Sequence, residues 1–358
     1  MISSPIHEDS AFDDPLLSWG RSVDASSLLS LWKEPMRLFR LANFLREERC
    51  GDVVTYVVNR NVNFTNRCVG SCRFCAFRRD DGYLLCEEEI LVRVEEAERF
   101  SATEICIQGG LAPGLVLEDY CRILEAVKEN YPRMHLHAFS PMEVSYMSEN
   151  SGTTVEESIR DLRAAGLGSM PGTAAEILVD RVRAEICPSK LSTEEWRDVI
   201  VTAHSLGVPT TSTILYGHVE RLEDRISHLL LIRDIQAETG GFTEFVLLPF
   251  MPANNDLGLS SRRIDPFENL KMHALARVAL DPLIVNIQAS WVKLGRELAG
   301  RATHWGVNDL GGTLMEENIS RTAGAAEGEV MTPRQFCDLI ERNGRVPAER
   351  TTLYRRVG

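Results

Sequence analysis

The sequence predicts an α/β fold: a (β/α)8 TIM-type barrel with an N-terminal helical extension and C-terminal helices. Short runs rich in β-branched and other apolar residues alternate with amphipathic helical segments along the chain. Strands separated by helices form a parallel sheet, and eight such units close into a barrel of about 250 residues plus insertions. The length of 358 residues suits one barrel. The expected strands are residues 62–66, 104–110, 135–140, 167–172, 211–217, 242–250, 283–290 and 307–313.

The segments between these strands carry apolar residues at the spacing typical of amphipathic helices. Apolar residues share one helix face in two of them: Ile90, Val94 and Ala97 in the first, and Leu117, Tyr120, Leu124 and Val127 in the second. Two further helices carry capping boxes at their starts, Thr154 with Glu157 and Ser192 with Glu195. These signals justify the alternation on which the barrel depends.

The sequence contains no linker rich in Pro, Ser or Gly, which favours a single catalytic domain. We expect a tail and helical extension over residues 1–50 and one barrel over residues 51–330. A C-terminal helix and tail would occupy residues 331–358, with the helix beginning at Thr332-Pro333 and ending near Gly344.

Composition narrows the classes of function. The formal charge of -13 argues against a nucleic-acid partner, because phosphate binding requires a basic surface. The sequence contains no run of about 18 apolar residues, so it predicts no membrane span. The acidic first residues do not resemble a secretory signal. Nine cysteines in such a chain are typical of a reducing compartment, so we expect a cytoplasmic location.

Three cysteines are clustered, whereas the other six are scattered and fit small apolar positions. Cys68, Cys72 and Cys75 follow the first expected strand at C-x3-C-x2-C spacing, which lets one loop surround a compact metal centre. Iron-sulfur clusters that are fully ligated by protein use four thiolates. Three thiolates leave one iron open, and this iron can chelate the amino and carboxylate groups of S-adenosylmethionine (SAM). The loop therefore predicts a 4Fe-4S cluster and SAM as cofactors.

A zinc site is the alternative at this point. It would need a fourth ligand such as Cys86 or a histidine, and structural zinc sites usually combine two paired elements. The sequence contains no second pair, and Cys86 lies at the expected start of a helix. These observations favour the cluster.

Polar residues follow most of the expected strands. In a barrel these positions meet at the carboxyl-terminal face, where active sites lie. They include Asn66, Gln108-Gly109-Gly110, residues 140–143, residues 216–218, residues 288–291 and Asn308-Asp309. Turn formation explains glycine and asparagine there, but not glutamine, histidine, glutamate and tryptophan together.

The cysteine loop resembles the signature of the radical SAM superfamily. The resemblance implies that the backbone of Phe74 contacts adenine and that Gln108-Gly109-Gly110 receives the methionine end of SAM. The commoner motif has glutamate after the glycine pair, whereas this chain has Leu111. We therefore expect Glu176, after the fourth strand, to accept the SAM amino group instead.

A closer resemblance spans roughly residues 50–330. It rests on residues 63–66, 75–79, 137–144, 215–220, 288–293 and 308–313. These runs are similar to the tyrosine-using half of the deazaflavin (FO) synthase system. The resemblance implies transfer of the 4-hydroxybenzyl part of L-tyrosine to 5-amino-6-(D-ribitylamino)uracil, with release of iminoacetate. A single cysteine loop implies the stand-alone subunit. The resemblance implies an electron donor and the ring-closing synthase subunit as partners.

The strand-end residues can be matched to this chemistry as expectations. Their side chains suit polar substrates, ring stacking and proton transfer. We expect His137, Tyr216 and His218 to be catalytic, and Ser140, Glu143, Gln288, Ser290, Trp291, Asn308 and Asp309 to bind substrate.

Three other functions remain open on the sequence. Enzymes of the futalosine route to menaquinone resemble the chain around the cysteine loop and residues 311–313. The ring-closing half of the deazaflavin system is the second alternative. The third is not an enzyme: a scaffold that binds an iron-sulfur cluster or zinc would leave the polar strand ends unexplained.

Overall fold

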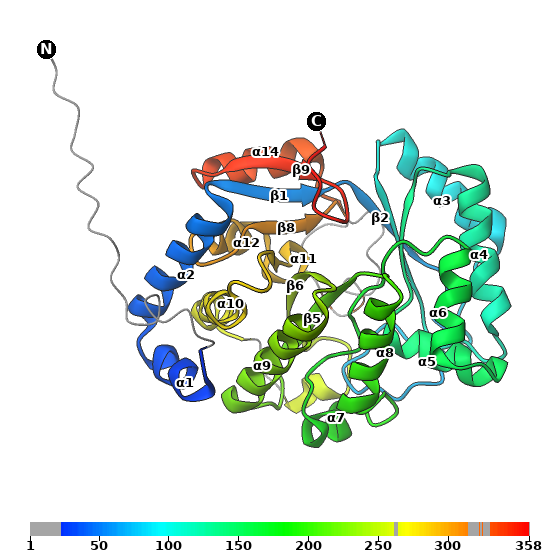
Figure 1. Cartoon of the computed structure of the whole chain (residues 1–358), viewed down its shortest axis with the longest axis horizontal. Helices are drawn as coiled ribbons and strands as arrows, with labels where there is room; N and C mark the ends of the chain where they lie inside the picture. Colours follow the sequence, from blue (N-terminus) through cyan, green and yellow to red (C-terminus); the bar gives the residue numbers. More distant parts are fainter. Residues whose placement is uncertain (1–22, 261–263, 314–321, 323, 325–329, 358) are drawn as a thin grey trace, which may run out of the picture.

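The computed structural model describes residues 23–260, 264–313, 322, 324 and 330–357, and the chain forms the expected α/β barrel (Figure 1). The strands are β1 (Val53–Val57), β2 (Asn59–Asn63), β3 (Glu104–Gln108), β4 (His135–Ala138), β5 (Thr210–Tyr216), β6 (Phe242–Pro249), β7 (Ile287–Ala289), β8 (Asp309–Gly312) and β9 (Val346–Arg350). All strand pairs are parallel.

The barrel wall consists of two hydrogen-bonded sheets, ordered β5-β6-β7-β8-β1-β9 and β2-β3-β4. β1 and β2 are almost continuous in the chain, and β1 pairs with β8 while β2 pairs with β3. One bent strand segment therefore joins the two sheets. On the other side, isolated bridges join His137 to Ser169 and Met170 to Thr210, which closes the wall between β4 and β5.

The fourth expected strand is the weakest part of the wall. Residues 167–172 form only these two bridges and no strand, because Gly168, Pro171 and Gly172 interrupt the segment. Gly172 is also required sterically, since an added Cβ would collide with the carbonyl oxygen of Thr211. The expectation of a full fourth strand was wrong, although the segment keeps its place in the barrel.

Two strands were not expected from the sequence. β1 precedes the first expected strand, and β9 follows the C-terminal helix where a tail was expected. β9 pairs with β1 over its whole length, from Val53 with Val346 to Val57 with Arg350. Figure 1 shows β9 and α14 together beside β1. The division of the chain at residues 50 and 330 stays a prediction.

The helices cover the outside of the wall. They are α1 (Ala25–Lys33), α2 (Pro35–Cys50), α3 (Glu87–Arg99), α4 (Leu117–Asn130), α5 (Pro141–Ser151), α6 (Val155–Ala164), α7 (Asp180–Ile186), α8 (Thr193–Ser205), α9 (Leu222–Thr239), α10 (Pro266–Leu280), α11 (Trp291–Leu294), α12 (Arg296–Ala302) and α14 (Pro333–Arg342), with a 3-10 turn η1 (Leu257–Ser260). The apolar faces expected in α3 and α4 are buried. The capping boxes expected at Thr154 and Ser192 are present, and Thr332 caps α14 as predicted.

The N-terminal helices form the expected extension on one side of the barrel. α1 and α2 pack against α9 and α10, beside which Figure 1 shows them. The acidic tail that was expected before them lies outside the described residues. None of the described helices combines the length and hydropathy that crossing a bilayer requires.

Candidate active site

A cavity of about 410 Å³ occupies the barrel interior and reaches the loops that follow the strands. Many residues selected from the sequence line it. They are Cys68, Cys72, Phe74, Cys75, Gln108, Gly109, Gly110, His137, Ser140, Glu143, Glu176, Gln288, Ser290 and Trp291. The strand ends therefore converge on one site, as a barrel requires.

The cysteine loop lies between β2 and α3, and backbone hydrogen bonds hold it on both sides. Val69 donates its N–H to the carbonyl of Leu111 over 3.0 Å, and Arg73 donates to that of Ile186 over 2.9 Å. Cys68, Cys72 and Cys75 all face the cavity. Cys86 instead caps α3 at an exposed position, as its place in the sequence indicated.

The donor set fits a cluster more closely than a single ion. Three thiols from one loop share the cavity wall. Among the described residues, no three His, Cys, Asp or Glu side chains are grouped to hold one metal ion. Soft thiolates are the ligands that iron-sulfur clusters use.

Gly109 and Gly110 lie against the cysteine loop because they have no side chains. A Cβ on Gly110 would collide with the carbonyl oxygen of Arg67 and would lie 2.9 Å from the Cβ of Cys68. A Cβ on Gly109 would lie 2.6 Å from the ring of Phe64. Gly110 also donates its N–H to the carbonyl of Thr65 over 2.9 Å. The glycine pair thus places the end of β3 directly beside the first cysteine.

Glu143 joins this glycine motif to the start of α5. Its Oε1 accepts the backbone N–H of Gly109 over 3.0 Å. Its Oε2 accepts both the N–H and the hydroxyl of Ser140, each over 2.7 Å, which completes a capping box. Burial raises the pKa of Glu143 to about 7. Ser140 and Glu143 therefore position the cavity wall, and their contact with substrate stays a prediction.

Glu176 forms a buried ion pair with Lys190 on the cavity wall. The Lys190 Nζ lies 2.5 Å from the Glu176 Oε1 and 5.3 Å from the centroid of the Phe74 ring. Burial opposes the charge on Lys190, but the surrounding acidic groups, of which Glu176 contributes most, together raise the pKa of Lys190. Glu176 adopts a left-handed backbone conformation with φ of 44°, which directs this loop toward the cysteines.

His137 is buried on β4 and lines the cavity. Its Nδ1 lies 2.7 Å from the hydroxyl oxygen of Ser169. Burial lowers the pKa of His137 to about 4, so the imidazole is neutral near pH 7. A neutral imidazole offers one donor and one acceptor nitrogen, which suits orientation of a substrate.

An ionic network forms the deep end of the cavity. Arg350, at the end of β9, lies 3.3 Å from Glu244 on β6 and binds Asp309 on β8 through two nitrogens. Glu244 also accepts hydrogen bonds from Gln288, over 2.9 Å, and from the hydroxyl of Tyr354. Burial raises the pKa of Glu244 to about 7. The segment after β9 thus closes the barrel.

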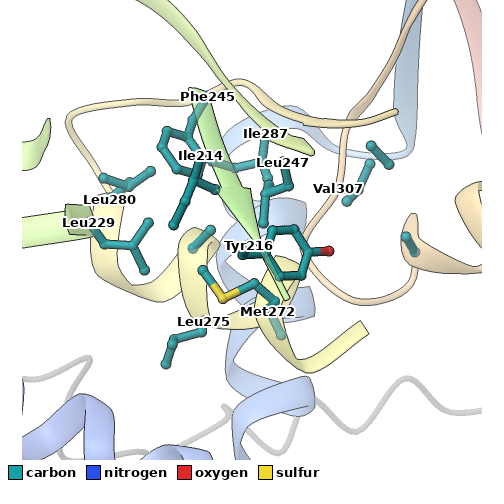
Figure 2. Close-up of a cluster of buried hydrophobic side chains, with 14 of the residues drawn as sticks. Ile214, Tyr216, Leu229, Phe245, Leu247, Met272, Leu275, Leu280, Ile287 and Val307 are labelled. Carbon is teal, nitrogen blue, oxygen red and sulfur yellow. The ribbon is translucent and has the colours of Figure 1, made fainter. Parts of the chain in front are cut away.

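Tyr216 and His218 are not among the described residues that line the cavity. Tyr216 is fully buried in the apolar core, where Figure 2 shows it near Met272, and its hydroxyl donates to Asn269 over 2.7 Å. The His218 Nδ1 lies 2.9 Å from Glu220. Tyr216 faces away from the cavity because alternate residues of β5 face opposite sides of the barrel wall, and His218 lies in the loop after β5. This placement does not support the predicted catalytic role of either residue.

Asn308 and Asp309 are also not among the cavity-lining residues described. The Asn308 Oδ1 accepts from Arg277, over 2.7 Å, and from the backbone of Ile287. Asp309 is fully buried by its bonds to Arg350 and to the N–H of Gly311. Both residues support the wall, and this placement does not support the predicted substrate contact.

Three further residues expected to bind substrate lie on the remaining wall. Gln288 faces the cavity but is hydrogen-bonded to Glu244, and Ser290 caps α11. Trp291 donates its indole N–H to the carbonyl of Gly312 over 2.9 Å and is fully buried, with its ring 6.3 Å from that of Phe336. All three line the cavity, so their contact with substrate stays a prediction.

Sequence reasoning missed several polar cavity residues, among them Lys190, Glu244, Arg350, Asn61 and Asn63. Lys190 and Arg350 lie outside expected strands, so the strand-end criterion could not find them. The two asparagines carry a readable signal, because polar residues at alternate positions of a buried strand point into the barrel.

Two family models match consecutive parts of the chain. The model described as the radical SAM superfamily matches residues 62–232. The model described as the CofH/MqnC C-terminal region matches residues 239–357.

Curated relatives match nearly the whole chain. A protein of Archaeoglobus fulgidus is 57% identical over 328 residues, which cover 92% of this chain and 96% of the relative. It is named 5-amino-6-(D-ribitylamino)uracil–L-tyrosine 4-hydroxyphenyl transferase. A protein of Methanosarcina mazei with the same name, numbered 1, is 56% identical and covers 94% of this chain and 91% of the relative.

Solved structures support the fold. The crystal structure of methylornithine synthase (PylB) superimposes with a TM-score of 0.74 at 17% identity, covering 93% of this chain and 96% of that one. The maturase HydG from Carboxydothermus hydrogenoformans gives 0.69 at 17% identity, covering 89% and 73%. At this identity the likeness shows the barrel alone.

Proposed function

The chain belongs to the family of 5-amino-6-(D-ribitylamino)uracil–L-tyrosine 4-hydroxyphenyl transferases, within the radical SAM superfamily, and we propose that it catalyses this transfer. The 4-hydroxybenzyl group of L-tyrosine would move to the uracil after cleavage of the tyrosine Cα–Cβ bond, leaving iminoacetate. The observation that carries the proposal is the identity of 57% over 96% of a relative with this name. The names of these relatives favour this transfer over the three alternatives left open by the sequence.

The residues present fit the cofactors of the superfamily. Cys68, Cys72 and Cys75 would hold the 4Fe-4S cluster at the cavity wall. Gly109 and Gly110 also line this cavity, and the close contact of Gly110 with Arg67 and Cys68 would bring the end of β3 beside the cluster, where we propose that it receives SAM. The cluster and SAM supply one-electron chemistry when they are bound. The other contacts that we propose for SAM are the backbone of Phe74, Gln108 and the carboxylate of Glu176.

Lys190 adds a second contact of opposite charge beside Glu176. A paired carboxylate and ammonium can bind an amino acid group of the opposite charges, because each partner accepts one end. The pair is mostly shielded from solvent, with side chains 18% and 12% exposed, which strengthens its attraction to such a ligand. We place the amino acid end of SAM against Glu176 and Lys190.

The deeper cavity would hold the two substrates away from water. His137 is neutral and can orient a hydroxyl or an N–H group without adding charge. Gln288 and Ser290 offer donors and acceptors to the uracil edge, while Trp291 closes the wall beside them. Excluding water matters because a reactive intermediate would otherwise be quenched.

Two partners complete the proposal. An electron donor must reach the cluster, and the ring-closing synthase subunit would take over the product. The unpaired cysteines and an oxygen-sensitive cluster favour a reducing compartment, which we propose to be the cytoplasm.

The function is tested with anaerobically reconstituted, reduced protein given SAM, tyrosine and the ribitylaminouracil. Mass spectrometry should detect 5′-deoxyadenosine and a hydroxybenzyl-uracil adduct, and both should disappear in Cys72→Ala. Deoxyadenosine without adduct would contradict the proposed substrates, and a loaded cluster without deoxyadenosine would contradict the enzyme class.

A further inference from the structure

Strand β2 presents a row of asparagines to the barrel interior. Asn59, Asn61 and Asn63 occupy alternate positions and all line the cavity. The intervening residues face outward, where Arg60 pairs with Glu96 and Val62 packs in the core. Because alternate residues of a strand share one face, the inward face of β2 forms a polar wall inside the site.

Two of these asparagines carry acceptor atoms without a protein partner. The Oδ1 atoms of Asn61 and Asn63 are buried and accept no hydrogen bond, although the side chains are only 9% and 6% exposed. The Oδ1 of Asn59 is not among these unpartnered atoms, and the Asn59 amide donates to Glu104 over 2.9 Å. The amide of Asn63 donates to the carbonyl of Gln108 over 3.4 Å, which leaves its oxygen as the unpartnered atom. A buried polar atom without a partner is costly, so its presence in a cavity wall indicates that a ligand satisfies it.

The neighbouring groups are neutral and polar. Across the strand pair, Asn61 lies opposite Cys106 and Asn63 lies opposite Gln108, and both of these partners also line the cavity. The charged groups of the cavity lie elsewhere in its wall: Glu104 accepts from Asn59, Arg350 binds Glu244 and Asp309, and the pair of Glu176 with Lys190 is assigned to SAM. A neutral ligand with several hydrogen-bond donors suits this wall better than a charged one.

Spacing narrows the ligand further. Alternate residues of a strand lie about 6.6 Å apart, which is more than twice a hydrogen-bond length. An extended chain bearing several hydroxyl groups contacts two acceptors at this spacing more readily than one ammonium nitrogen does. The uracil substrate of the proposed function has such a chain, its ribityl group, whereas tyrosine has none.

We propose that Asn61 and Asn63 form a subsite for the polyhydroxylated chain of the uracil substrate, with their amide oxygens accepting hydrogen bonds from its hydroxyl groups. This inference rests on the proposed function and adds the determinant of uracil specificity to it. It also assigns the tyrosine ammonium to another part of the cavity.

Equilibrium binding tests the subsite without turnover. Isothermal titration calorimetry on the cluster-loaded, unreduced protein would compare the ribityl substrate with 5-amino-6-(pentylamino)uracil, which lacks the chain hydroxyls. Wild type should bind the ribityl compound at least about tenfold more tightly. Asn61→Leu and Asn63→Leu should each weaken that compound about tenfold and leave the pentyl compound and L-tyrosine unchanged.

Asn130→Leu is the matched control, because this amide donates to the Ala126 carbonyl and is not among the described residues that line the cavity. It should bind all three ligands as wild type does. Equal affinity of wild type for the ribityl and pentyl compounds would overturn the subsite even if a variant misfolds, and so would loss of tyrosine affinity alone. If wild type turns over both substrates while the variants bind normally, the subsite fails and the proposed function stands. If wild type binds no ribityl compound, the proposed function fails and the subsite with it.

Discussion

The guanidinium of Arg350 binds both carboxylate oxygens of Asp309, with Nε 2.5 Å from Oδ2 and Nη2 3.0 Å from Oδ1. Both side chains are buried, so the pair connects β9 to β8 inside the protein. Arg350 also lines the cavity and contacts Glu244. One residue near the C-terminus therefore contributes both to the barrel wall and to the active site.

Arg350→Met should destabilise the protein strongly. The change leaves Asp309 buried without its cation, and breaking one side of a buried pair costs about 3–5 kcal/mol. Denaturant unfolding measures this loss. Arg160→Met is the control, because its pair with Glu156 is exposed and should contribute little. Equal stability of the two variants would contradict a structural role for Arg350.

Tyr216→Phe should retain turnover within about twofold. The tyrosine lies in the core, so removing its hydroxyl affects only the bond to Asn269 and costs about 1 kcal/mol of stability. Turnover assays and denaturant unfolding together check this expectation. His137→Ala is the comparison, because the imidazole lines the cavity and its loss should lower kcat/KM by at least about tenfold. A larger loss of activity in Tyr216→Phe than in His137→Ala would contradict the expectation that Tyr216 has only a structural role.

Gly110→Ala should disrupt cluster binding. The new Cβ would meet the carbonyl of Arg67 and the Cβ of Cys68, and backbone on both sides prevents a simple adjustment. Iron content and visible absorbance of the reconstituted protein measure the effect. Gly114→Ala, in a loop where the added Cβ meets nothing within 4 Å, should keep its iron despite some backbone strain. A fully loaded Gly110→Ala protein would contradict the close packing of the two loops.

His273→Gln should flatten the acid side of the stability profile. Burial lowers the pKa of His273 to about 4 from its ordinary 6.5, so the unfolded chain binds a proton first as the pH falls. This stability is fully present above pH 6.5 and is lost progressively toward pH 4. Between pH 7.5 and 5.5 the variant should lose about 1.4 kcal/mol less than wild type. Parallel denaturant titrations at the two pH values provide the comparison, and identical losses would contradict it.

Local patterns made most of the barrel predictable. β3, β5 and β6 are short, mostly buried runs rich in β-branched and other apolar residues, and the capping boxes are contained within four residues each. β9 could not be found in this way, because Pro347 and Glu349 disfavour a strand and the segment is held by distant partners, β1 through backbone pairing and Asp309 through Arg350. The prediction of a strand at residues 167–172 was wrong for the opposite reason. This segment keeps its place in the barrel wall through two isolated bridges, without forming a strand.

The site shows the same division between local and distant information. Cys68, Cys72 and Cys75 lie within eight residues, so their spacing alone indicated the centre. The pair of Glu244 with Arg350 joins residues 106 positions apart, and no local pattern reveals it. Tyr216 and His218 were selected by position at a strand end, but that position does not decide which side of the wall a residue faces.

The most direct test of the central claim follows the tyrosine ring into the product. The reduced, cluster-loaded protein would receive SAM, the ribitylaminouracil and tyrosine labelled with carbon-13 throughout its ring, and mass spectrometry would locate the label. We predict a uracil adduct that carries the complete ring label, formed by wild type and not by Cys72→Ala. Label that remains in tyrosine while 5′-deoxyadenosine accumulates, or an adduct without label, would contradict transfer of the tyrosine side chain.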